Sequence, residues 1–216
     1  MARGALVPAV LIASALVLAT ACTHVVDDAR VVAASDMGKA ASSVSDCTSV
    51  DAPMTALPDH NADEPVMRIP QPAGWERMTQ MDSELIRFTM RNASLAKDGF
   101  APTAVVTLES DRGNALPRKV FDAQERALRD QVGATDLHST EITLCGLPAA
   151  MVEYTMPRLG SLPPHPAKVV AAVLHTDDKT YAMTMTLQSL DADDPTYRTD
   201  SDTILTGFQM LPPSAR

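Results

Sequence analysis

Residues 168–187 read KVVAAVLHTDDKTYAMTMTL, two apolar runs joined by the turn-forming residues Thr176-Asp177-Asp178-Lys179. Every residue of the run 169–174 is apolar, so this strand needs cover on both faces, as a central strand does. In residues 180–187, larger apolar side chains alternate with alanine and threonine, so one face of that strand is more polar. The stretch predicts an antiparallel hairpin at the centre of a sheet.

Other segments with the composition of strands lie on either side of this hairpin. Gly146-Leu147-Pro148 predicts a second hairpin turn, between strands at residues 140–145 and 149–156. Earlier strands are expected at residues 66–69, 85–90 and 103–109. The sequence therefore predicts a central antiparallel sheet of about six strands.

Two helices are expected beside this sheet. Residues 116–132 carry apolar residues at three- and four-residue spacing, and Gly133 follows where a helix commonly ends. The second helix is expected to begin at Asp194-Pro195, an N-cap followed by proline, and to close at Gly207. Runs of strands broken by single helices predict an α+β fold. The expected packing face of the first helix consists of Leu116, Val120, Ala123, Ala127 and Leu128.

The first 22 residues are typical of an exported bacterial lipoprotein. Arg3 precedes a nearly unbroken apolar stretch, residues 5–19, which is too short for a comfortable membrane span. Ala19-Thr20-Ala21-Cys22 then predicts a cleavage site followed by a cysteine that takes a diacylglycerol. Ordinary secretion, with cleavage at the same bond, is the alternative. Both interpretations place the mature chain outside the cytoplasmic membrane, and the first anchors it to the extracytoplasmic face.

Two cysteines remain if Cys22 carries lipid. Cys47 and Cys145 can pair in an oxidising compartment, so we expect a disulfide between them. A redox pair or a metal site is the alternative, but neither cysteine has Cys-x-x-Cys spacing or a neighbouring histidine.

The chain divides into four expected parts. Residues 1–21 are the signal peptide, and 22–63 are a lipid-anchored tether and an extended approach segment, in which Pro53 and Pro58 favour loop-like chain. Residues 64–211 are the globular domain, and 212–216 are a loose tail. The formal net charge of −9 argues against binding to nucleic acid. It also indicates that contact with an anionic bilayer comes from the lipid.

No catalytic motif stands out. The sequence lacks His-Glu-x-x-His, a Gly-x-Ser-x-Gly elbow and a glycine loop for phosphate, and its five histidines do not share metal-ligand spacing. Met183-Thr184-Met185 has the form of a copper ligand pair, but core packing on one strand face explains it better. We therefore expect no catalytic residue, cofactor or metal. A hydrolase or transferase assembled from distant residues, with His138, His165 or His175 as base, remains an alternative, as does a metal-binding lipoprotein.

Two segments are candidate walls of a ligand-binding cleft. One is the turn that ends at Trp75, the only tryptophan. The other is the stiff, proline-rich connection at residues 159–166, with Pro163, Pro164 and His165. The alternative for this connection is a long hairpin loop. The twelve methionines also favour an adaptable apolar pocket, as a lipid tail would need.

Residues 67–75 read MRIPQPAGW and follow the lipobox and tether. This entry, together with Gly146-Leu147-Pro148-Ala149 before a strand and a terminal helix ending in Gly207-Phe208, resembles the mycobacterial Lpp-LpqN family over about residues 64–211. The resemblance implies a PsbP/Mog1-like α/β/α sandwich with flanking helices. It also implies a non-enzymatic envelope protein that engages envelope lipids or a membrane lipid-transport partner, and it transfers no catalytic residue.

Overall fold

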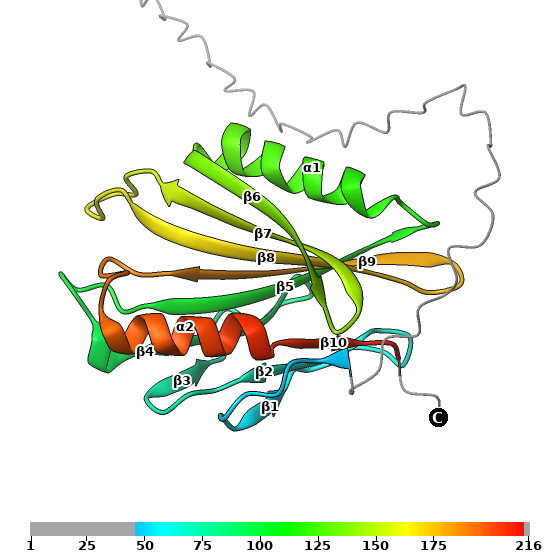
Figure 1. The fold of residues 1–216 in the computed structure, drawn as a ribbon, viewed down its shortest axis with the longest axis horizontal. Coiled ribbons are helices and arrows are strands. Elements are labelled where there is room, and N and C mark those ends of the chain that lie inside the picture. Colours follow the sequence, from blue (N-terminus) through cyan, green and yellow to red (C-terminus); the bar gives the residue numbers. More distant parts are fainter. Residues whose placement is uncertain (1–45, 214–216) are drawn as a thin grey trace, which may run out of the picture. The chain divides into compact units, whose positions relative to one another are not determined.

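The 168–187 hairpin lies in the middle of a seven-stranded antiparallel sheet, as predicted (Figure 1). The computed structural model describes residues 46–213. The hairpin consists of β8 (His165–His175) and β9 (Lys179–Gln188), and residues 169–174 are all buried. The strand order is β3-β4-β5-β9-β8-β7-β6. The other strands are β3 (Trp75–Met78), β4 (Ile86–Asn92), β5 (Thr103–Arg112), β6 (Thr135–Leu144) and β7 (Leu147–Met156).

A second, three-stranded sheet has the order β1-β2-β10. Its strands are β1 (Met54–Ala56), β2 (Val66–Pro70) and β10 (Gln209–Leu211). Only β2 was expected, because the other two are too short to carry a periodic pattern. The folded part also takes in residues before the expected start at 64, since β1 pairs with β2 and Leu57 is buried.

The first predicted helix is confirmed, but its packing face differs. It consists of α1 (Pro117–Ala127) and a π-helical turn, η3 (Leu128–Val132), and Gly133 ends it with a φ of 77°. Leu116 was expected on the buried face and is 61% exposed. It precedes Pro117 in extended conformation, as residues before proline prefer, so it does not share the helical face. Phe121 is buried instead and packs with Ala150 and Ala171.

The second helix is also confirmed. It is α2 (Pro195–Gly207), and the side chain of Asp194 accepts hydrogen bonds from the backbone N–H groups of Thr196 and Tyr197, both at 2.9 Å. These bonds satisfy donors that have no partner inside the helix. Its buried face consists of Tyr197, Ser201, Ile204 and Leu205. A short 3-10 turn, η2 (Ala93–Leu95), follows β4.

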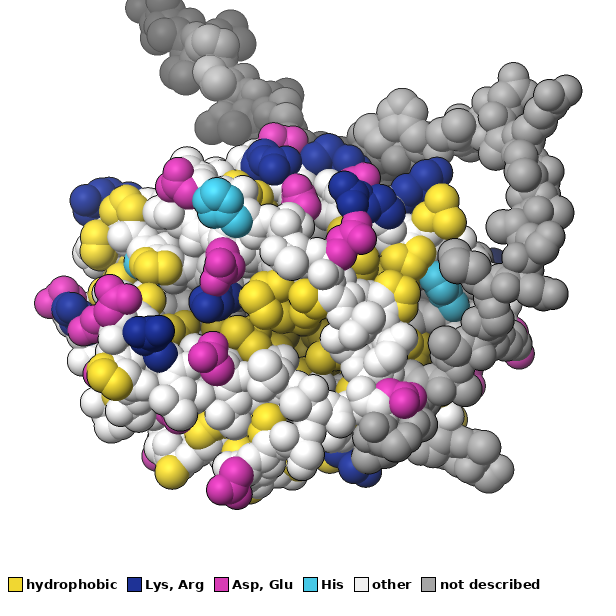
Figure 2. Space-filling model, in the orientation of Figure 1, with side chains coloured by type: hydrophobic (Ala, Val, Ile, Leu, Met, Phe, Trp, Pro, Cys, Tyr) yellow, Lys and Arg dark blue, Asp and Glu magenta, His cyan; other side chains and the backbone are white. Residues whose placement is uncertain are grey.

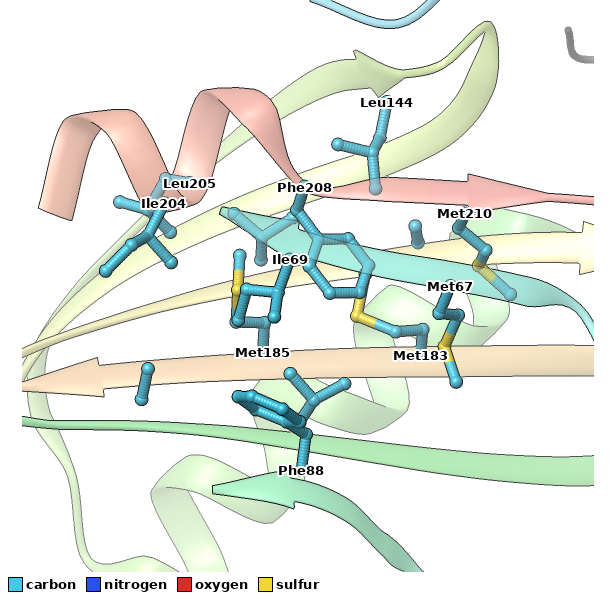
Figure 3. Packing of buried hydrophobic residues seen from close by; sticks show 14 of the residues in the cluster. Met67, Ile69, Phe88, Leu144, Met183, Met185, Ile204, Leu205, Phe208 and Met210 are labelled. Carbon is cyan, nitrogen blue, oxygen red and sulfur yellow. The ribbon is translucent and has the colours of Figure 1, made fainter. Parts of the chain in front are cut away.

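The two faces of the large sheet are covered by different elements. On one face, Phe121 of α1 packs on Ala171 and Val173 of β8. On the other, α2 and the small sheet cover the side chains of β9, and Figure 3 shows Ile69, Phe208 and Met210 directed toward Met183 and Met185. Both methionines are fully buried, which confirms the core-packing interpretation. The fold is therefore α+β in three layers, and the PsbP/Mog1-like classification stays a prediction.

The expected disulfide between Cys47 and Cys145 is present and joins residues 98 apart in the chain. Cys145 and Gly146 form the two-residue turn between β6 and β7, with φ angles of 49° and 77°. Positive φ at both positions is the requirement of a type I′ hairpin turn, and glycine meets it at the second. The disulfide thus fixes the start of the folded part to one end of the large sheet.

Replacing Cys47 and Cys145 together by serine should lower the free energy of unfolding by about 2–5 kcal/mol, because the cross-link no longer restricts the unfolded chain. Urea unfolding of the mature chain carrying Cys22→Ser, with and without this change, measures the difference. The control is the same chain under reducing conditions, which should match the double variant. Equal stability of the oxidised and reduced chains would show that the bond does not constrain the fold.

A buried ion pair holds the 58–65 loop against β4. The guanidinium of Arg87 donates to both carboxylate oxygens of Glu64, at 2.8 and 2.9 Å, and the side chains are 5% and 8% exposed. Burial alone would raise the pKa of Glu64, but the hydrogen bond from Arg87, the backbone N–H of His60 and the Arg87 charge lower it below its usual value. The geometry is bidentate, the arrangement in which arginine and carboxylate bind best.

Arg87→Met should destabilise the fold by about 3–5 kcal/mol at neutral pH, because it leaves the Glu64 carboxylate buried without its partner. Glu64→Leu with Arg87→Met should cost less. Since the folded pKa of Glu64 is lowered, the pair's contribution is present above the ordinary glutamate pKa of about 4.3 and is lost as pH falls through the lowered value. Urea unfolding at neutral pH and at acid pH measures both effects. Lys97→Met, at an exposed pair with Asp191, is the control and should change stability little.

Candidate functional site

A groove lies at the end of β5, and we call it the β5 groove. Its volume is about 560 Å³. β4 pairs with β5 only as far as Ile86–Thr107, whereas β9 pairs with it as far as Arg112, so one side of β5 is open at this end. The lining residues are Glu84, Leu85, Leu108, Glu109, Ser110, Asp111, Ala115, Val120, Thr180 and Ala182.

The wall of the β5 groove that leads into α1 is fixed by Thr180. Its hydroxyl donates to the carbonyl of Gly113 at 2.6 Å and accepts from the backbone N–H of Ala115 at 2.9 Å. Both bonds tie the segment before α1 to β9. The two bonds hold Ala115 and the start of α1, with Val120, opposite the end of β5, so this wall of the groove is formed by the fold itself.

The lining of the β5 groove combines apolar side chains with acidic ones. Half of its ten lining residues are leucine, alanine or valine, and three are carboxylates, with no lysine or arginine among them. Apolar walls with a few polar groups are typical of ligand pockets. Sequence reasoning missed this site. The sequence signals for it are weak: a leucine, Leu85, in a polar loop, and the polar end of a strand at Glu109-Ser110-Asp111.

A smaller cavity of about 290 Å³ adjoins the β5 groove and shares Glu84 with it. The carboxylate of Glu84 lies 3.0 Å from Nδ1 of His60, and Glu84 is 92% exposed. Arg87, which holds the Glu64 carboxylate, lines the same cavity. Residues 82–84 line the smaller cavity and residues 84 and 85 line the β5 groove, so the loop before β4 lies between the two cavities.

A separate apolar surface lies on the side of the large sheet that carries α2. Figure 2 shows hydrophobic side chains gathered in a hollow at the centre of this side, with charged side chains around them. Ile142 of β6 and Met151 of β7 are half-buried and pack against the main core cluster. Lys168 of β8 and Glu153 of β7 form an ion pair at 2.9 Å beside them. We call the two half-buried side chains, Ile142 and Met151, on the side of the large sheet that carries α2, the β6–β7 hollow.

Trp75 begins β3 and is 3% exposed. Its indole N–H donates to the carboxylate of Asp200 in α2 at 2.8 Å, and its carbonyl accepts from the side-chain amide of Gln71 at 2.8 Å. A buried indole with its donor satisfied is typical of a core residue that fixes two elements together. Here it links the large sheet to α2.

His165 begins β8 and is 3% exposed. Its Nδ1 lies 2.9 Å from the carbonyl of Pro163, and its Nε2 lies 3.1 Å from the side-chain oxygen of Gln188. Pro163 and Pro164 are exposed in the preceding loop.

The structure does not bring these expected binding residues together. Trp75 and His165 lie on strands four steps apart in the sheet, roughly 19 Å at the usual spacing of strands. Neither cavity is lined by Trp75, Pro163, Pro164 or His165. Their role in binding a ligand stays a prediction, and the open surfaces lie elsewhere.

The histidines named as possible bases lie apart. The ring of His138 is on the exposed edge strand β6, and Nε2 of His175 lies 2.8 Å from the carbonyl of Ala115. Within residues 46–213, no cluster of three or more His, Cys, Asp or Glu side chains could hold a metal ion. Cys22, the signal peptide and the tether up to residue 45 lie outside the described residues, as does the end of the tail.

None of the helices in residues 46–213 has the length and apolar character needed to cross a membrane.

Comparisons with known proteins identify the family. Residues 48–211 match the sequence profile of the Lpp-LpqN family, described as probable lipoprotein LpqN. No curated protein sequence matches the chain. Among solved structures, the chain is similar to LpqN involved in cell envelope biogenesis of Mycobacterium tuberculosis, with a TM-score of 0.59 and 16% identity over 74% of this chain and 91% of that chain. It is also similar to a protein of unknown function, PA94 from Pseudomonas aeruginosa, with a TM-score of 0.44 and 16% identity over 76% and 99% of the two chains.

The sequence match extends the expected resemblance, which covered about residues 64–211, back to the residue after Cys47. The added segment contains β1, which completes the small sheet. Because the match spans most of the sequence, the chain belongs to the Lpp-LpqN family.

Proposed function

We propose that this chain is a non-enzymatic binding or adaptor protein of the bacterial cell envelope, anchored by lipid on Cys22 to the extracytoplasmic face of the membrane. It engages an envelope lipid or a membrane lipid-transport partner. The observation that carries the proposal is the match to a lipoprotein family over residues 48–211. The likeness to LpqN of M. tuberculosis, a protein involved in cell envelope biogenesis, supports the same compartment.

The surfaces left open by the fold are consistent with binding. The β6–β7 hollow presents half-buried Ile142 and Met151 rather than polar side chains. Methionine adapts its shape to a flexible apolar partner, and the cost of leaving such surface in water favours a ligand that covers it. An acyl chain is such a ligand. The lipid therefore has a candidate position on the side of the sheet that carries α2.

Lipidation is tested by metabolic labelling with a palmitate analogue in the native host. The wild-type chain should be labelled and should fractionate with membranes. Cys22→Ala should be unlabelled, because the thiol that accepts the diacylglycerol is gone. Cys47→Ala is the matched control and should keep the label. A wild-type chain without label would leave free secretion as the explanation of the signal peptide.

Lipid binding is tested by native mass spectrometry of the protein isolated from its own envelope. We expect a co-purified lipid, and Met151→Glu should reduce its occupancy at least about tenfold, since it places a charge against the acyl chain. Met81→Glu, at a side chain that is 46% exposed on the β3–β4 loop, is the matched control and should retain the lipid. Thermal unfolding establishes that both variants fold. If the wild-type protein carries no co-purified lipid, the lipid ligand is rejected and a protein partner is the remaining proposal.

A further inference from the structure

The β5 groove exposes large apolar side chains next to its concave surface. Leu85 in its lining is 45% exposed, and Leu116, which follows the lining residue Ala115, is 61% exposed. Single exposed leucines are common, but leucines around a cavity of about 560 Å³ have the form of a binding surface. This groove is distinct from the β6–β7 hollow, because none of its lining residues comes from β6 or β7.

The charges around the β5 groove specify what it can bind. Within residues 46–213, the side chain of Glu109 makes no ion pair or hydrogen bond, and the side chain of Asp111 accepts only the backbone N–H of Arg112, at 2.7 Å. Glu84 has His60 as its partner. Arg112 itself points to the opposite face, because side chains alternate along a strand. An anionic lipid headgroup would be repelled here, whereas a lysine or arginine would find an unpaired carboxylate.

The end of β5 also offers backbone groups. β4 stops pairing with β5 at Ile86–Thr107, and Leu108 donates its N–H to the carbonyl of Leu85 at 3.0 Å. Residues 109–112 of β5 have a partner strand on one side only, which is β9. An extended segment can add to such an edge by main-chain hydrogen bonds, with alternate side chains entering the neighbouring groove.

We propose that the β5 groove docks a segment of a partner protein in which apolar residues alternate with lysine or arginine. Its apolar side chains pack on Leu85 and Val120, and its cations meet Glu109 and Asp111. The inference deepens the proposed function, since it assigns a chemical class to the protein partner and leaves the lipid to the β6–β7 hollow.

The test uses the mature chain with Cys22→Ser and a short fluorescein-labelled peptide of alternating lysine and leucine. Fluorescence anisotropy should report saturable binding, and a peptide with glutamate in place of lysine should not bind. Glu109→Gln with Asp111→Asn should weaken binding about tenfold, since two charge pairs are lost. Leu85→Ser should also weaken it.

Matched controls remove the same groups elsewhere. Asp130→Asn with Asp202→Asn takes two exposed carboxylates from η3 and α2, and Leu159→Ser takes an exposed leucine from the β7–β8 loop. Both controls should bind the peptide as the parent chain does. Equal weakening in the groove and control variants would show attraction to net charge alone and would overturn the proposal. Unchanged binding in the groove variants would overturn it as well.

The outcomes separate this inference from the proposed function. If lipid co-purifies but peptide binding does not depend on the groove, the groove assignment is rejected and the proposed lipid-binding function stands. Groove-dependent peptide binding without any co-purified lipid supports the assignment and rejects the lipid. Circular dichroism and thermal unfolding of every variant establish that a loss of binding is not a loss of fold.

Discussion

The rest of the structure depends on covering both faces of β8, whose residues 169–174 are all buried. A strand that is apolar on both faces cannot lie at a surface, so one layer must form on each side of the sheet. Helix α1 supplies one layer, and α2 with the small sheet supplies the other. Neither layer reaches every strand. The β5 groove and the β6–β7 hollow lie where this cover stops, so the same constraint that builds the core also leaves its open surfaces.

The elements that could be predicted from the sequence are those with a local signal. The double apolar run of β8, the Asp194-Pro195 start of α2 and Gly133 after the first helix each depend on neighbouring residues alone. The strands β1 and β10 depend on distant partners, since both pair with β2, and three residues carry no period. Phe121 is buried where Leu116 was expected, because the helix begins at Pro117 and leaves Leu116 outside it.

The open surfaces could not be predicted because they are assembled from separate segments. The β5 groove combines the loop before β4, the end of β5, the start of α1 and the start of β9. Trp75 was named as a candidate ligand wall on composition alone, and the sequence could not show that its indole N–H donates to Asp200, 125 residues further along the chain. The cysteine pair was predictable because counting free thiols needs no knowledge of distance. Burial and partner choice, in contrast, are properties of the packed chain.

The disulfide fixes where the N-terminal segment meets the large sheet. Along the register of the sheet, the Cys145-Gly146 turn lies at the same end as Ser110 and Tyr181, which is the end that carries the β5 groove. Cys47 is bonded to that turn, so the tether joins the folded part there. With lipid on Cys22, residues 23–45 would span at most about 80 Å when fully extended. Under the proposed lipidation, the groove at this end would be held near the bilayer, and its effective concentration toward a membrane-borne partner would rise. A weak docking site would suffice under that confinement.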